Sequence, residues 1–223
     1  MSISNNLSSI EQKINQACQD FARTRNDIKL IAVSKTKPSS LIKQAYDCGQ
    51  KSFGENYLQE ALHKIDQLQG LDIEWHFIGS IQSNKAKIIA GNFSWVHSVA
   101  SLKVARLLSK HSKHTLNICL QVNLEDEVSK SGLNANETLQ LALNIKDLDN
   151  IRLRGLMAIP KPTKDFQQQI KQFTKVKNLF EQLKLQGLSL DTLSMGMSND
   201  FVAAIASGST MLRIGSDIFG KRQ

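Results

Sequence analysis

The sequence has few cysteines, few aromatic residues and no long apolar run. Its three cysteines, Cys18, Cys48 and Cys119, lie far apart and form no CxxC pair. This spacing argues against a disulfide framework or a zinc site and favours a reducing compartment. No apolar run approaches the roughly 20 residues that a membrane span needs, and the first residues lack the apolar core of a signal peptide. We therefore expect a cytoplasmic, soluble protein without a metal site.

Aromatic residues make up only 6% of the 223 residues, although the formal net charge is +8. A positive charge of this size suits a polyanionic partner. However, no basic run exceeds two residues, and no aromatic RNA-binding signature is interleaved with the lysines. The pattern disfavours a nucleic-acid partner and fits a small phosphorylated ligand better.

Short apolar segments alternate along the chain with segments of helical periodicity. The alternation predicts parallel strands, at residues 29–34, 51–53, 73–78, 93–97, 116–122, 151–157, 192–195 and 211–214. Eight such units favour an α/β fold, a single (β/α)8 TIM barrel over residues 1–223, with an extra helix at 4–24 packed outside it. A doubly wound open sheet is the alternative. The first strand-to-helix turn lacks the GxGxxG that its dinucleotide-binding version uses.

One amine lies at the end of the first predicted strand. The apolar run Leu30–Val33 ends in Ser34-Lys35-Thr36-Lys37, and a proline and two serines then open a helix. Ligands bind at the carboxyl ends of strands in such folds, so Lys35 is a candidate Schiff-base lysine for a phosphorylated aldehyde. The same pattern also fits a solvated surface lysine. Lys37 is a rival amine, which we expect to be exposed.

The segments after the last two predicted strands have the composition of a phosphate site. Gly196 and Ser198 follow the strand at 192–195, and Gly215 and Ser216 follow the strand at 211–214. In (β/α)8 barrels a phosphate often lies between these two loops. The alternative is purely structural: Ser198 caps the next helix, expected to extend to about residue 207, and Gly215 only makes a turn.

Several polar residues within or after the predicted strands leave two interpretations open. A guanidinium at Arg213, inside a strand, is costly unless paired, so it either pairs with a carboxylate or faces a ligand ring. Asn56 either caps the following helix or binds a ligand. We expect His76 and His97 to be packed core residues. The sequence does not show whether Lys130, in a polar loop, approaches the barrel mouth.

Together, seven motifs in order resemble the pyridoxal phosphate (PLP) homeostasis proteins, a family of cytoplasmic PLP-binding proteins. The resemblance extends from about residue 3 to residue 221, and the family fold is a barrel like the N-terminal domain of alanine racemase. The motifs are AVSKTKP at 32–38, FGENY at 53–57, WHFIG at 75–79, SKSG at 129–132, GLMAIP at 155–160, LSMGMSND at 193–200 and GSTMLRIGSDIFG at 208–220.

The resemblance implies a complete PLP site. By it, Lys35 carries PLP as a Schiff base, Arg213 faces the pyridine nitrogen and Asn56 lines the ring. The residues that would hold the phosphate are Ser198, Gly215 and Ser216.

Three positions depart from the family pattern, but none of them removes a needed group. Ser80 stands where proline or histidine is expected, Asn199 where the family often has aspartate, and Ser216 where threonine is usual. Ser216 keeps the hydroxyl. We therefore expect all of the family's PLP-binding positions to keep their roles in this sequence.

The resemblance implies a carrier in vitamin B6 and amino-acid homeostasis, not an enzyme. An arginine facing the pyridine nitrogen keeps it unprotonated, which weakens carbanion stabilisation. Alanine racemases take a second base, a tyrosine, from an added β-domain, and neither Tyr46 nor Tyr57 is an evident substitute. We expect no catalytic residue; a weak amino-acid racemase is the alternative. Expected partners are PLP and apo PLP-dependent enzymes that receive it, with no nucleic acid or membrane, and the chain is expected to be a monomer.

Overall fold

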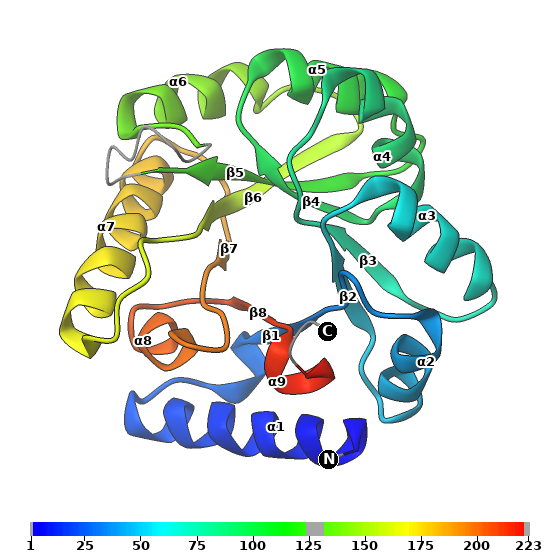
Figure 1. Cartoon of the computed structure of the whole chain (residues 1–223). Helices are drawn as coiled ribbons and strands as arrows, with labels where there is room; N and C mark the ends of the chain where they lie inside the picture. The colour runs from blue at the N-terminus through cyan, green and yellow to red at the C-terminus, as the bar shows by residue number, and fades with distance from the viewer. Residues whose placement is uncertain (1, 124–131, 221–223) are drawn as a thin grey trace.

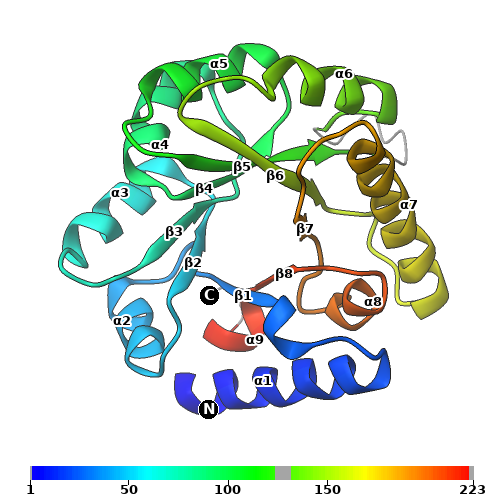
Figure 2. The same ribbon diagram turned by 180° about the vertical axis from the view of Figure 1, so that it is seen from behind.

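The computed structural model describes residues 2–123 and 132–220 and shows a closed barrel of eight parallel strands. Each strand pairs with the next one along the chain. The last strand, Met211–Ile214 (β8), pairs with the first, Lys29–Val33 (β1), and Arg213 there lies opposite Ile31. Helices surround the strands (Figures 1 and 2). The closed barrel confirms the predicted fold and excludes the open sheet.

The elements follow the predicted alternation of strand and helix. The other strands are β2 (Ser52–Glu55), β3 (Glu74–Phe77), β4 (Trp95–Val99), β5 (Leu116–Val122), β6 (Ile151–Ala158) and β7 (Thr192–Ser194). The helices are α1 (Ile3–Asp20), η1 (Arg25–Asp27), α2 (Ser39–Asp47), α3 (Leu58–Gln67), η2 (Ser83–Lys85), α4 (Ala86–Asn92), α5 (Leu102–His111), α6 (Ala135–Ile145), α7 (Phe166–Leu185), α8 (Phe201–Ala206) and α9 (Ser216–Phe219). Within the described ranges, none of them is long and apolar enough to cross a membrane.

Apolar side chains fill two layers, one between the strands and the helices and one inside the barrel. The amphipathic helix α1 shows how the outer layer forms, since Leu7, Ile10 and Ile14 recur at helical spacing and are buried. This helix packs against α2, α8 and α9 beside the closure of the barrel (Figure 1). Burying each large aliphatic side chain contributes about 1.5–3 kcal/mol. The inner apolar cluster contains Ile31, Trp95, Cys119, Met157 and Met211.

Some predicted boundaries are wrong for local reasons. Helix α1 ends before Ala22, which has a left-handed φ of 51° that a helix cannot continue through. Strand β4 begins at Trp95, because Phe93 still belongs to the C-cap of α4. Helix α2 begins at the two serines as predicted, with Pro38 at its N-cap position, and the Ser39 hydroxyl donates to the side-chain oxygen of Gln67 at 2.7 Å.

Candidate functional site

A cavity of about 300 Å³, here called the mouth cavity, lies where the strands end. It brings together all six residues that the sequence predicted for a PLP site: Lys35, Asn56, Ser198, Arg213, Gly215 and Ser216. The other described lining residues are Val33, Thr36, Lys37, Ile78, Ile159, Met197, Asn199 and Gly220. Lys130 lies outside the residues that the structure describes.

Lys35 lies in the turn between β1 and α2, and we call Ser34, Lys35 and Thr36 the Lys35 turn. Ser34 is fully buried, and its N–H donates to the carbonyl of Gly54 at 3.0 Å, which continues the strand pairing beyond β1. Thr36 has a φ of 62°, a conformation that strains a β-branched residue. Lys35 is half-buried, so it is not the fully solvated lysine that the sequence also allowed. The expectation that Lys37 is exposed is wrong, because it is half-buried in the same cavity wall.

Asn56 reaches the cavity from the loop after β2. It does not cap α3, whose N-cap position is occupied by Tyr57 without a side-chain hydrogen bond. The Asn56 Oδ1 atom is buried and has no hydrogen-bond partner among the described residues. Gly79 allows this close packing, since a Cβ there would lie only 1.9 Å from the backbone oxygen of Asn56. A buried acceptor without a partner in a cavity wall marks a place for a polar ligand.

Arg213 extends from β8 and is only 4% exposed. It donates to the Ser194 carbonyl at 2.6 Å, to the Ser194 hydroxyl at 2.7 Å and to the Ala158 carbonyl at 2.9 Å. These acceptors are all neutral, so within residues 2–123 and 132–220 no direct carboxylate pair, which the sequence allowed, holds this side chain. Burial lowers the pKa of Arg213 to about 10, although the nearby Asp200 charge opposes the shift. The guanidinium therefore remains charged at neutral pH.

A chain of hydrogen bonds leads from Arg213 through the barrel interior. Ser194 Oγ lies 2.8 Å from His97 Nδ1, His97 Nε2 lies 2.9 Å from His76 Nδ1, and His76 Nε2 lies 2.9 Å from a Glu74 carboxylate oxygen. A carboxylate only accepts, so His76 Nε2 donates to Glu74, and with both imidazoles neutral the direction of the other two bonds follows. Ser194 donates to His97, His97 to His76 and His76 to Glu74. We call these four residues the histidine chain.

The histidine chain is uncharged until it reaches Glu74. Burial lowers the pKa of His76 and lowers that of His97 still further, so both imidazoles are neutral. Burial alone would raise the pKa of Glu74, but the hydrogen bond from His76 and the hydrogen bond and charge of Lys29 lower it overall. Lys29 Nζ lies 2.6 Å from Glu74. The prediction that His76 and His97 are packed core residues is confirmed, and their connection to Arg213 is new.

The two predicted phosphate loops meet at Ser198 and Ser216, whose hydroxyl oxygens lie 3.1 Å apart. The prediction that Ser198 caps the next helix is wrong. Helix α8 begins only at Phe201, and the residue at its N-cap position is Asp200. The Ser198 hydroxyl is therefore directed to the other loop.

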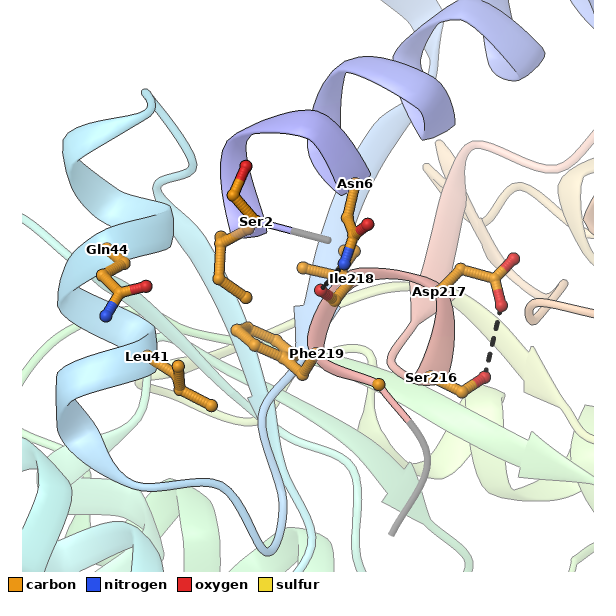
Figure 3. A pocket seen from close by; sticks show the side chains of 10 residues that line it. Ser2, Asn6, Leu41, Gln44, Ser216, Asp217, Ile218 and Phe219 are labelled. Carbon is orange, nitrogen blue, oxygen red and sulfur yellow. Dashed lines mark hydrogen bonds between the residues drawn. The ribbon is translucent and has the colours of Figure 1, made fainter.

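Gly215 and α9 complete this side of the cavity. A Cβ on Gly215 would lie 3.1 Å from the Val33 carbonyl, so glycine lets β8 continue close to β1. Asn6 of α1 donates to the Ile218 carbonyl at 2.8 Å, which fixes α9 against the first helix (Figure 3). Figure 3 also shows the neighbouring pocket between α1, α2 and α9, which shares Ser216 and Gly220 with the mouth cavity.

The ionisable groups among the described residues of the mouth cavity are all cationic. Among its described lining residues these groups are Lys35, Lys37 and Arg213, with no carboxylate, histidine, cysteine or tyrosine. Tyr57 is 52% exposed outside the cavity, and the Tyr46 hydroxyl accepts a backbone N–H at 3.1 Å elsewhere. Positive charge together with serine hydroxyls suits an anionic ligand.

Comparison with known proteins shows the family to which the chain belongs. The family model for the alanine racemase N-terminal domain matches residues 6–223. The pyridoxal phosphate homeostasis proteins of Haemophilus influenzae and Escherichia coli K12 are 49% and 45% identical to this chain. They cover 100% and 99% of it, and it covers 97% of each. The chain belongs to the PLP homeostasis protein family.

Solved structures with the same barrel fold include a PLP-binding relative and an alanine racemase. PipY of Synechococcus elongatus, determined with PLP bound, is 32% identical, with a TM-score of 0.87 over 98% of this chain and 100% of that one. An alanine racemase of Clostridium difficile is 15% identical with a TM-score of 0.74, which shows a shared fold. The match covers 56% of the racemase chain.

Proposed function

We propose that this chain binds PLP reversibly through Lys35 and acts as a carrier in vitamin B6 and amino-acid homeostasis. The mouth cavity carries the proposal, because it combines an amine, positive charge and hydroxyl donors in about 300 Å³. The names of the relatives and the PLP bound to PipY support the choice of cofactor.

The residues of the cavity fit the chemical groups of PLP. PLP supplies an aldehyde that reacts with primary amines. Lys35 would provide the amine: its Nζ forms a C=N bond to the aldehyde carbon, and one water leaves. Ser198 and Ser216 would donate to the phosphate, and Gly215 would let the backbone approach it. The unpartnered Oδ1 of Asn56 would accept a hydrogen bond from the ligand.

The same residues support a carrier over an amino-acid racemase. Arg213 has only donors, so beside the pyridine nitrogen it leaves that nitrogen unprotonated and a poor electron sink. A racemase also needs a base on each side of the substrate carbon, and no tyrosine lines the described part of the cavity. We infer that PLP is held and released without catalytic turnover.

An absorbance spectrum tests the proposal. Purified protein with PLP should show a band near roughly 420 nm, typical of a lysine Schiff base. The band should be absent in Lys35→Ala and present in Lys43→Met, an exposed lysine of α2. Absence of the band in the unaltered protein would exclude the Schiff base. Exchange of the alanine α-proton at catalytic rates would favour the racemase.

Three wider features belong to the same proposal. We infer that residues 1–223 form one PLP-binding domain, that the chain is a cytoplasmic monomer, and that apo PLP-dependent enzymes receive the cofactor. Size-exclusion chromatography with light scattering tests the monomer. The PLP-loaded chain is incubated with an apo-enzyme, either mixed with it or separated from it by a dialysis membrane. The comparison tests whether transfer of PLP requires contact between the two proteins.

A further inference from the structure

Charged side chains of α3 hold the peptide groups on both sides of Lys35. Lys64 Nζ donates to the carbonyl of Ser34 at 2.7 Å, and this carbonyl belongs to the peptide bond before Lys35. The carboxylate of Glu60 accepts the N–H of Thr36, which belongs to the peptide bond after Lys35. The lysine backbone is therefore fixed from both directions by one helix.

Glu60 and Lys64 of α3 form a charged cluster with Glu55 of β2, in which Lys64 and Glu55 are buried and Glu60 is partly exposed. Lys64 uses its three donors on Ser34, on Glu55 at 2.7 Å and on Glu60. The Ser34 hydroxyl also donates to Glu55, at 2.6 Å. The Lys64 and Glu55 side chains are only 5% and 0% exposed. Burying an ion costs several kcal/mol unless pairing and hydrogen bonds compensate, so an apolar pair would serve packing equally well.

The cluster holds a strained backbone. Thr36, with its φ of 62°, is a β-branched residue in the left-handed region, which persists only where surrounding contacts impose it. The N–H of this same residue is the one that Glu60 accepts. Strain at the residue next to a functional lysine points to a backbone conformation selected for the position of that lysine.

A lysine side chain is long and loses rotamer entropy when it is fixed. Fixing its backbone reduces the volume that the amine must search. Resting on the proposed role of Lys35, we propose that Glu60 and Lys64 are positioning residues for Schiff-base formation. They set the Cα of Lys35 so that its amine meets an aldehyde held by the rest of the mouth cavity.

Glu60 gives the cleanest test, because its side chain is 28% exposed and can be altered without opening the buried Lys64–Glu55 pair. Glu60→Ala removes the acceptor for Thr36, whereas Glu60→Gln keeps it. Two ligands are compared: PLP, and pyridoxine 5′-phosphate, which has the same ring and phosphate but an alcohol in place of the aldehyde. Losing a charged hydrogen-bond acceptor should weaken PLP binding about tenfold in Glu60→Ala and by less than about threefold in Glu60→Gln.

The second ligand separates positioning from general damage. Binding of pyridoxine 5′-phosphate should change less than about twofold in Glu60→Ala, because no covalent bond is involved. Equal weakening of both ligands, or unchanged PLP binding, would overturn the proposal. Lys64→Met should show the same selective loss if it folds, as judged by thermal unfolding; if it does not, the Glu60 pair decides. A wild-type protein without the Schiff-base band would refute the role of Lys35 itself, a different result.

Discussion

Two buried polar networks support the mouth cavity: a charged cluster beside Lys35, and the histidine chain beside Arg213, which is neutral except at its far end, Glu74. The charged cluster of Glu55, Glu60 and Lys64 contacts backbone groups of the Lys35 turn. The histidine chain contacts the guanidinium of Arg213 and passes hydrogen bonds in one direction through the barrel. One network fixes a stretch of backbone, and the other fixes a side chain.

The difference follows from what each supported residue has to do. Arg213 can offer its charge to a ligand because neutral acceptors hold it without cancelling that charge. Lys35 has to reach an aldehyde as an amine, and the charged cluster acts on the residues before and after it. Changes in backbone and pairing should therefore act mainly on the charged cluster, and the buried neutral histidines should make the histidine chain sensitive to acid.

Gly79→Ala should have the largest effect on stability. The new Cβ would lie 1.9 Å from the Asn56 carbonyl, so the backbone that follows Glu55 must move, and the charged cluster with it. We expect a loss of about 3 kcal/mol or more in the free energy of unfolding, measured with urea. The matched control is Gly91→Ala in α4, where a Cβ meets nothing within 4 Å and should be neutral or stabilising by up to about 1 kcal/mol. Equal unfolding midpoints for the two variants would contradict this account.

Acid should act on the histidine chain. His76 and His97 have pKa values lowered by burial from an ordinary 6.5, so the unfolded chain takes up protons first as the pH falls. Their stabilisation is complete above pH 6.5 and is lost below it, toward the folded pKa values. Each histidine should contribute a slope of up to about 1.4 kcal/mol per pH unit in this window.

Urea unfolding at pH 7.5 and pH 5.5 measures this slope. The loss in the free energy of unfolding between the two pH values should be smaller in His97→Gln than in the unaltered protein. His63→Gln, on the exposed side of α3, is the control. The fixed direction of the bonds also predicts that both rings carry hydrogen on Nε2, which nitrogen NMR reads directly. Ring signals that titrate near pH 6.5 would show that the histidines are not held in this hydrogen-bonded chain.

The smallest effect should come from Ser198 and Ser216, which neither network contacts. Replacing both by alanine removes two hydroxyl donors, and PLP affinity should fall about tenfold. The Schiff-base band should still form at saturating PLP, because Lys35 and its support are intact. Ser9→Ala, on the exposed side of α1, is the matched control. Loss of the band in the double variant would mean that anion binding and the lysine support are not separable.

The sequence predicted the barrel and the residues of the mouth cavity, because strand alternation puts every carboxyl end on one face. It could not predict the partners of those residues, which come together only when the barrel closes. His76 and His97 are 21 positions apart, and Ser194 lies 97 positions beyond His97. One signal for the charged cluster was available: Lys64 occupies the buried stripe of α3 with Ala61, where a lone lysine is unusual.

The central claim is that Lys35 is the amine that takes PLP, and reductive trapping tests it most directly. The protein is incubated with PLP, reduced with borohydride, digested and mapped by mass spectrometry. We predict one modified lysine, Lys35, although Lys37 lines the same cavity two residues later. Modification at Lys37 instead, or no site-specific modification, would contradict the account.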